Sequence, residues 1–458
     1  LEVQTFVLDF KSSEVRKLHF FSQVITTSYC MEGDMATANS AAKMGAEREI
    51  KIFAGLDIGC SKVSMVIGQE KSNSTEIEVI GVGSSICTGI RKGVVVNIEA
   101  TTAAIQKAKD EAELMAGVEI SRVFVSIGGG HIKSFDSRGM IAVSNNEVTA
   151  ADVERVIEAA KAVSVPSDRD VVHVLPKEFK VDEQDGIFDP VGMNGVRLEA
   201  SVHIVTGGTT AIQNAVKCTR NAGLEVLGFV LQPMASALAV LSEDEKKLGA
   251  AVADIGSGTT DIVVYHQGSL SFTKSLPVGG SHITNDVAVG MRTPQGNAEI
   301  IKKKYGTALA DMVDPEEVID IEGVGGRNAR SVRRKDLCEV IEPRTEEILH
   351  MIGNSIFESG LSQLLGSGVI LTGGTSQIDG ITDLGEFVLD MPVRRGSVGK
   401  VGGLSETVKS PAFATAVGLL FYAQTQQDAE AVKVEEEISF FGGIRRRMKR
   451  LFNETTQA

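Results

Sequence analysis

The sequence predicts an α/β fold with an internal repeat, and three features carry this prediction. Two β-hairpin segments share one design: a β-rich run leads through an aspartate and a glycine-rich turn with hydroxyl side chains into a second β-rich run. The first is IKIFAGLDIGCSKVSMVIGQ around Asp57, and the second is GAAVADIGSGTTDIVVYHQG around Asp254, 197 positions later. A third segment, GVILTGGTSQIDG, opens a buried strand into the pair Gly373 and Gly374, where the backbone can approach a ligand closely.

Composition bounds the class of protein. The 458 residues, 43% hydrophobic and 23% charged, have the balance of a folded chain of roughly two to four domains. The net charge of −14 argues against a broad nucleic-acid surface, so no nucleic-acid partner is expected. The five cysteines form no CxxC pair, which favours neither a zinc site nor disulfides and fits a reducing cytoplasm. No run of 18 apolar residues exists, so no membrane-spanning helix is predicted.

The turns of the two hairpins suit phosphate binding. Exposed backbone N–H groups in a glycine-rich turn form an anion-binding nest. Asp57 and Asp254 would then hold Mg²⁺ between the turns, directly or through its waters. One such hairpin is often an ordinary structural element, but two in register favour a ligand. The chain lacks the GxxxxGK[ST] pattern of a P-loop, and the triplet Gly128 to Gly130 precedes no helical GxxG pattern, so it is not a dinucleotide fingerprint.

The two ends of the chain differ in character. Residues 1–46 have apolar runs broken by charges, and we expect a poorly ordered extension without function. Residues 424–437 are acidic and read as a flexible linker. Residues 438–458 carry an amphipathic helix pattern typical of a membrane-surface anchor, although docking on the protein's own body or a calmodulin-type target peptide would share it. The predicted membrane-binding residues are Phe440, Phe441, Ile444, Arg445, Arg446, Arg447, Met448, Lys449, Arg450, Leu451 and Phe452.

The hairpins and the third turn resemble the phosphate-one, phosphate-two and adenosine motifs of the superfamily of actin, DnaK chaperones and sugar kinases. That resemblance implies an actin-like two-lobe fold of duplicated ribonuclease-H-like domains, with ATP and Mg²⁺ in the interlobe cleft. More narrowly, GLDIG, GVRLEASVHIVTG, VADIGSGTTDI, AEIIKKKYG, VIEPR, VILTGG and the basic terminal helix resemble, in this order, the FtsA family of bacterial cell-division proteins. The resemblance spans residues 51–452.

The resemblance also implies the binding residues. Glu299 and Lys302 lie one helical turn apart and would reach the ribose or adenine, whereas on their own they would be read as a surface salt bridge. Asp57 and Asp254 are the implied metal ligands. The implied nucleotide-binding residues are Gly59, Cys60, Ser61, Lys62, Gly256, Ser257, Gly258, Thr259, Thr260, Gly279, Gly280, Asn285, Glu299, Lys302, Thr372, Gly373, Gly374 and Thr375.

Hydrolysis needs a group that orients the attacking water. Gln232 immediately precedes Pro233, which starts a helix well, and is the candidate, with Asp261 assisting; capping of that helix is the alternative role for Gln232. An amide is no general base, so turnover should be slow or negligible, and whether the protein acts as an enzyme stays open.

The resemblance implies a domain order and partners. An inserted α+β subdomain, called 1C, would contact later division proteins and the neighbouring subunit of a filament. A basic cluster of Arg327, Arg330, Arg333 and Arg334 would bind the acidic tail of the tubulin-like protein FtsZ, with a solvated loop as the alternative. The implied segments are lobe one (47–125 and 207–248), subdomain 1C (126–206, in a region from Ser121 to about Thr206 whose first strand is VFVSIGG), lobe two (249–423, with subdomain 2B at about 285–365), the linker and the membrane-targeting tail.

The resemblance therefore implies an ATP-binding protein at the cytoplasmic face of the membrane, peripheral and at the division site, which tethers the FtsZ ring to anionic lipids and self-assembles. Two alternatives remain. A pilus-assembly platform protein of similar fold would lack the basic terminal helix, and a phosphotransferase or chaperone ATPase would need a catalytic carboxylate or a substrate-binding domain that we do not find in the sequence.

Overall fold

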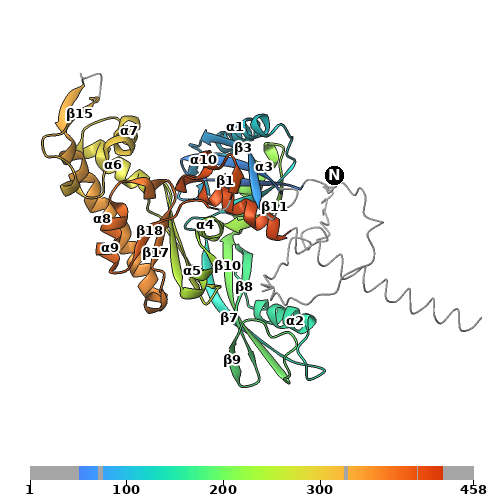
Figure 1. The fold of residues 1–458 in the computed structure, drawn as a ribbon. Helices are drawn as coiled ribbons and strands as arrows, with labels where there is room; N and C mark the ends of the chain where they lie inside the picture. Colours follow the sequence, from blue (N-terminus) through green and yellow to red (C-terminus); the bar gives the residue numbers. More distant parts are fainter. Residues whose placement is uncertain (1–50, 71–75, 324–328, 400, 427–458) are drawn as a thin grey trace, which may run out of the picture.

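The computed structural model describes residues 51–70, 76–323, 329–399 and 401–426. The predictions for the extension 1–46, for the membrane-targeting tail 438–458, for most of the linker 424–437 and for Arg327 fall outside these residues. Two lobes lie side by side, and a smaller domain extends from the first lobe beneath them (Figure 1). No helix in the described part of the chain is long and apolar enough to cross a membrane.

Lobe one is built on a six-stranded mixed sheet with the strand order β11-β6-β1-β2-β3-β19. Its central strands are rich in Val and Ile and almost fully buried, because helices cover both faces. The strands are β1 (Ile52–Ile58), β2 (Lys62–Glu70), β3 (Ile77–Ile86), β6 (Arg122–Ile127), β11 (Glu225–Leu231) and β19 (Val401–Gly403), with a small pair β4 (Ile90–Arg91) and β5 (Val94–Val95). The helices are α1 (Ile98–Ala116), α3 (Thr209–Asn221) and α4 (Gln232–Val240), and the next helix, α5 (Glu243–Leu248), packs instead against residues 260–266 of lobe two.

The inserted domain is a four-stranded antiparallel sheet, in the order β7-β10-β8-β9, covered by one helix. Thr149 and Asp152 form a capping box that starts this helix, and its buried positions Val153, Val156 and Ile157 recur at helical spacing to face the sheet. The elements are β7 (Lys133–Ala142), α2 (Ala150–Lys161), β8 (Arg169–Val181), β9 (Gln184–Ile187) and β10 (Arg197–Gly208).

Strand β6 differs from the prediction, which made VFVSIGG the first strand of the insertion. Gly55 of β1 pairs in parallel with Phe124 of β6, and β11 pairs with the other edge of β6. The strand is therefore central to lobe one, and the inserted sheet starts at β7. Local β propensity cannot decide this, because the partner strands are distant in sequence.

Lobe two repeats the plan with a five-stranded sheet in the order β14-β13-β12-β17-β18. Its strands are β12 (Ala250–Ile255), β13 (Thr260–His266), β14 (Ser269–Leu276), β17 (Val369–Thr372) and β18 (Val393–Arg395), and a separate ribbon pairs β15 (Val318–Ile321) with β16 (Arg330–Arg333). Its helices are α6 (Gly280–Gly290), α7 (Gln295–Tyr305), α8 (Arg334–Glu358) and α9 (Ile381–Leu389). Short 3-10 turns are Ala310–Met312, Ser362–Leu364, Gly374–Gln377 and Pro411–Phe413.

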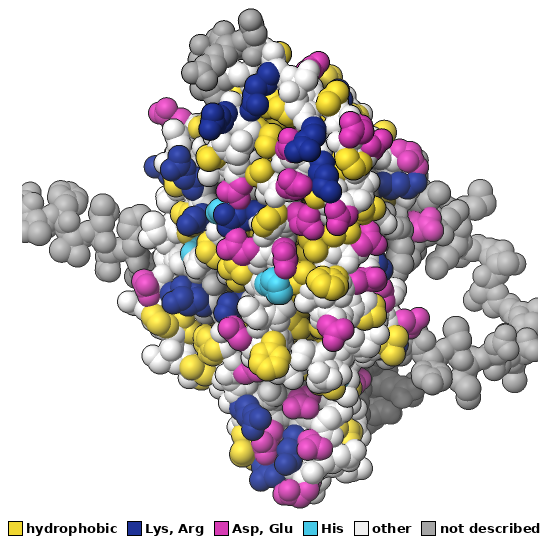
Figure 2. Space-filling model, turned by 90° about the vertical axis from the view of Figure 1, so that its left-hand side faces the viewer, with side chains coloured by type: hydrophobic (Ala, Val, Ile, Leu, Met, Phe, Trp, Pro, Cys, Tyr) yellow, Lys and Arg dark blue, Asp and Glu magenta, His cyan; other side chains and the backbone are white. Residues whose placement is uncertain are grey.

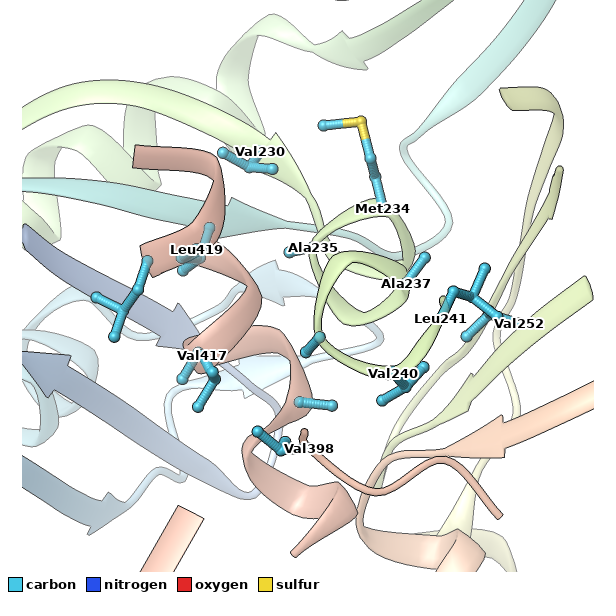
Figure 3. Close-up of a cluster of buried hydrophobic side chains, with 14 of the residues drawn as sticks. Val230, Met234, Ala235, Ala237, Val240, Leu241, Val252, Val398, Val417 and Leu419 are labelled. Carbon is cyan, nitrogen blue, oxygen red and sulfur yellow. The ribbon is translucent and has the colours of Figure 1, made fainter. Parts of the chain in front are cut away.

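The chain returns to lobe one near its end, although the sequence assigned everything from 249 to 423 to lobe two. Strand β19 pairs with β3, and after the short helix α10 (Ser405–Val408) a helix over residues 414–426 packs on α4. Figure 3 shows this helix beside α4, with Ala235 on the side of α4 that faces it. This buried cluster joins both lobes, because it extends from Val230 of lobe one to Val252 of lobe two.

Candidate nucleotide-binding cleft

A cleft of about 470 Å³ opens between the two acidic hairpins. Both hairpins form as predicted: β1 pairs with β2 and places Asp57 opposite Ser64, and β12 pairs with β13 and places Asp254 opposite Asp261. The predicted site residues that line the cleft are Asp57, Gly59, Cys60, Ser61, Lys62, Gln232, Asp254, Gly256, Ser257, Gly258, Thr259, Asp261, Gly280, Glu299, Lys302, Gly373, Gly374 and Thr375.

The first hairpin presents a buried carboxylate. Asp57 Oδ1 accepts a hydrogen bond from Ser126 Oγ at 2.7 Å and another from Gln232 Nε2 at 3.3 Å. Burial raises the pKa of Asp57, against the opposing effect of the Ser126 hydrogen bond. Since a buried carboxylate is favourable only when its charge is compensated, this wall of the cleft favours a cation.

The second hairpin carries two carboxylates. Asp254 Oδ2 accepts hydrogen bonds from Ser236 Oγ at 2.5 Å and from Thr415 Oγ1 at 3.0 Å. Asp261 Oδ1 accepts the backbone N–H of Gly129 at 3.3 Å. Burial, together with the neighbouring charges of Asp261 and Asp57, raises the pKa of Asp254 to about 7, against the opposing effect of the Ser236 hydrogen bond. The charge of Asp57 raises the pKa of both Asp254 and Asp261, so the floor of the cleft is a place for positive charge.

The side chains of this floor supply only some of the ligands that a divalent ion needs. Across the described ranges, no three His, Cys, Asp or Glu side chains gather closely enough to hold a metal by themselves. Mg²⁺ usually keeps several waters and takes one or two carboxylates plus phosphate oxygens. Asp57 and Asp254 therefore suit Mg²⁺ that arrives with a phosphate ligand.

The cleft also contains lysines, and Lys62 lies near enough to the floor for its charge to lower the pKa of Asp57. Lys62 Nζ lies 3.7 Å from the centre of the Phe413 ring, and burial lowers the pKa of Lys62. Lys302 is 6% exposed and forms an ion pair with Glu299 at 2.6 Å, while also donating to Thr284 Oγ1 at 2.8 Å. The surface salt bridge that the spacing alone suggested is thus a largely buried pair in the cleft wall.

Gln232 is the first residue of α4, as Pro233 predicted, but its side chain does not cap the helix. The cap position is Leu231, and the Gln232 amide instead donates to Asp57 and, at 3.5 Å, to Ser126 Oγ. The amide is therefore placed in the cleft beside the first hairpin, where orientation of a water is chemically reasonable.

Four predicted nucleotide-binding residues do not line the cleft. Thr260 is fully buried and donates to the Val278 carbonyl at 2.9 Å, and Thr372 is fully buried beneath the third turn. Asn285 is on the exposed side of α6, and Gly279 packs under the second hairpin turn. Strand alternation explains Thr260, because neighbouring Asp261 points to the opposite face. Helical periodicity explains Asn285, because Thr284 already faces the Glu299–Lys302 pair.

Other lining residues were missed. They are Ile58, Gly93, Lys303, Gly306, Gln377, Ile378, Asp379, Pro411, Ala412 and Thr415. Ser126 and Ser236 were also missed, although each binds a cleft aspartate. Gln377 and Asp379 directly follow the third turn, so extending that motif by two to four residues would have found them. For Thr415 the sequence offers no local signal.

The described members of the basic cluster have internal partners. Arg334 pairs with Glu317 at 2.9 Å and Arg333 pairs with Asp336 at 2.6 Å. Arg330 is exposed and donates to the Met291 carbonyl at 2.7 Å. The face of the molecule viewed in Figure 2, which includes lobe two, shows acidic and basic side chains interspersed. An acidic ligand would therefore depend more on Arg330 than on its two paired neighbours.

The two-lobe α/β fold, with paired acidic hairpins at an interlobe cleft, defines a protein of the actin-like class. The FtsA family model, described as cell division protein FtsA, matches residues 251–418, and a second model, the SHS2 domain inserted in FtsA, matches residues 129–206. Cell division protein FtsA of Pseudomonas aeruginosa is 44% identical over 392 residues, which cover 85% of this chain and 94% of that protein. FtsA of Neisseria meningitidis serogroup B is 42% identical, covering 88% and 98%.

The chain belongs to the FtsA family of cell division proteins, as these identities over most of its length show. Among solved structures, the PilM-PilN type IV pilus biogenesis complex shares the fold, with a TM-score of 0.58 over 81% of this chain and 98% of that one. At 18% identity that likeness shows the fold alone, so it does not support a function in pilus assembly for this chain.

Proposed function

We propose that this chain binds ATP with Mg²⁺ in the interlobe cleft. The observation that carries the proposal is the placement of the Asp57 and Asp254 carboxylates, both with raised pKa values, at the base of two glycine-rich turns. The backbone N–H groups of the turns would bind phosphate oxygens, and the two carboxylates would hold Mg²⁺ directly or through its waters. When bound, Mg²⁺ neutralises phosphate charge that would otherwise repel these acids.

We assign the adenosine to the third turn and the Glu299–Lys302 pair. Gly374, Thr375 and this pair all line the cleft, together with the neighbouring Lys303, which is 72% exposed at its side chain. Gln232 would orient a water, with Asp261 close by. An amide in that role supports slow turnover, so the bound nucleotide would act chiefly as a switch.

We further propose that the protein links the FtsZ ring to the inner face of the cytoplasmic membrane. The basic amphipathic pattern of residues 438–458 supports attachment to anionic lipids, and Arg330 supports capture of the acidic FtsZ tail. Self-assembly into filaments and recruitment of later division proteins through the inserted domain complete the proposal. Membership of the FtsA family favours this role over a phosphotransferase or chaperone.

The experiment that tests nucleotide binding replaces one metal-holding carboxylate. Asp254→Ala should abolish Mg²⁺-dependent binding of a fluorescent ATP analogue to the full chain, because the phosphate-bound Mg²⁺ loses its ligand in lobe two. Asp185→Ala, an exposed aspartate in strand β9 of the inserted domain, is the control and should bind like the parent protein. Retained Mg²⁺-dependent affinity in Asp254→Ala would mean that the second hairpin is not the phosphate site.

A further inference from the structure

The triglycine segment Gly128 to Gly130 follows β6 and lies against the cleft, although its sequence fits no known nucleotide fingerprint. A Cβ atom placed on Gly128 would lie 2.1 Å from Gln232 Oε1 and 2.8 Å from Gln232 Cδ. Real Cβ atoms do not approach other heavy atoms so closely, since this is far inside van der Waals contact. The missing side chain of Gly128 is therefore the space that the Gln232 amide occupies.

The same segment also contacts the second hairpin. The N–H of Gly129 donates to Asp261 Oδ1 at 3.3 Å, across the junction between the lobes. Gly129 has a φ of +102°, and a Cβ there would lie 2.6 Å from the Lys92 carbonyl oxygen, so only glycine fits. Gly128 thus leaves room for Gln232, and Gly129 donates to Asp261. The two adjacent glycines therefore contact both of the residues that we propose to position the attacking water.

The Gln232 side chain is held from its other side as well. Its Nε2 donates to Asp57 Oδ1 at 3.3 Å and to Ser126 Oγ at 3.5 Å. Ser126 is two residues before Gly128 and also accepts the backbone N–H of Ile58 at 3.1 Å. One short stretch of chain, residues 126–129, therefore fixes the amide from both directions and reaches across to Asp261.

We propose that Gly128 and Gly129 are positioning residues for ATP hydrolysis, an inference that rests on the proposed nucleotide-binding function. In that reaction the water oxygen bonds to the γ-phosphorus, and the bond from this phosphorus to the bridging oxygen breaks with its electron pair leaving on ADP. The water protons pass to phosphate and solvent. Gly128 acts through Gln232, which orients the water, and does not itself touch it. A displaced orienting group slows such a step on the order of 10- to 100-fold.

Two alanine substitutions in this loop provide a test variant and its matched control. The atoms that a Cβ on Gly128 would meet are at the flexible end of Gln232, so Gly128→Ala folds by moving that side chain out of place. Gly130→Ala changes the same loop two residues later, where a Cβ meets nothing within 4 Å. The first should therefore disturb the amide and the second should not.

A crystal structure of each variant without nucleotide tests the geometry. In Gly128→Ala the Gln232 amide should leave Asp57, whereas in Gly130→Ala the 3.3 Å contact should persist. An unmoved amide in Gly128→Ala would overturn the inference. This readout is independent of ATP, so it decides the geometry even where the proposed function fails.

Single-turnover hydrolysis of saturating ATP tests the role. Gly128→Ala should lose as much rate as Gln232→Ala, roughly tenfold or more, and the double variant should lose no more than either single variant. The affinity for ATP should change by no more than about twofold, because the substitution removes no contact with ATP that is made in both the ground state and the transition state. Additive losses, or a loss confined to affinity, would overturn the inference. A parent protein that binds no ATP would instead refute the proposed function, and one that binds ATP without turnover would refute the hydrolytic role.

Discussion

His173 provides a sharp prediction about acid sensitivity. The side chain comes from β8 of the inserted domain, is 8% exposed and accepts the backbone N–H of Leu231 at its Nε2, at 3.1 Å. Its ring also lies 6.3 Å from the ring of Tyr422, centre to centre. Burial lowers the pKa of His173 from 6.5 to about 4. The imidazole is therefore neutral in the folded protein, and a proton on Nε2 would remove the acceptor for Leu231.

The sign and magnitude follow from linkage. Between pH 6.5 and 4 the unfolded chain binds a proton at this histidine that the folded chain does not, so the free energy of unfolding falls as the pH falls. The full shift corresponds to about 3 kcal/mol, and the part lost between pH 7.5 and pH 5.0 is about 2 kcal/mol. Above pH 6.5 this contribution is constant.

The assay is urea unfolding of the full chain at pH 7.5 and pH 5.0. Other groups titrate in this interval, so the quantity to compare is the stability difference between the parent and His173→Gln, whose amide oxygen can still accept from Leu231. From pH 7.5 to pH 5.0 the free energy of unfolding of the parent should fall by about 2 kcal/mol more than that of His173→Gln. An equal pH dependence for the parent and His173→Gln would refute the reasoning.

Three further predictions concern the inserted domain and the proposed partners. Thr273→Val should lower the free energy of unfolding by about 1 to 2 kcal/mol, because His203 Nε2, bound to Thr273 Oγ1 at 3.2 Å, loses its partner at the contact with lobe two; unchanged denaturant midpoints would contradict this. Arg330→Glu should weaken capture of an acidic FtsZ tail peptide several-fold in fluorescence anisotropy, with Arg155→Glu as control, and equal affinities would exclude Arg330 from that surface. Deletion of residues 438–458 should abolish sedimentation with anionic liposomes while ATP binding is retained, and unchanged sedimentation would rule out the tether.

The sequence predicted those parts of the site that local chemistry determines. A glycine-rich turn between two β-rich runs favours a hairpin, and both predicted hairpins form, with Asp57 and Asp254 in the lining of the cleft. Pro233 likewise predicted the first turn of α4 and so the position of Gln232. These features need only neighbouring residues.

Contacts between distant segments could not be predicted from a single sequence. Thr415 binds Asp254 from 161 residues away, and Ser126 binds Asp57 from 69 residues away, with no shared local pattern to connect them. The same reason explains why β19 and the helix over 414–426 return to lobe one against expectation. Thr260 and Asn285, by contrast, could have been left out of the expected cleft lining, because strand and helix periodicity turns both side chains away from the cleft.

The central claim is that ATP and Mg²⁺ bind between the two acidic hairpins, and a crystal structure of the full chain with a non-hydrolysable ATP analogue and Mg²⁺ tests it most directly. The account predicts phosphate oxygens against the turns at residues 59–62 and 256–259, with Mg²⁺ or its waters on Asp57 and Asp254. A nucleotide bound elsewhere, or a cleft that stays empty at saturating concentrations of the analogue, would contradict it.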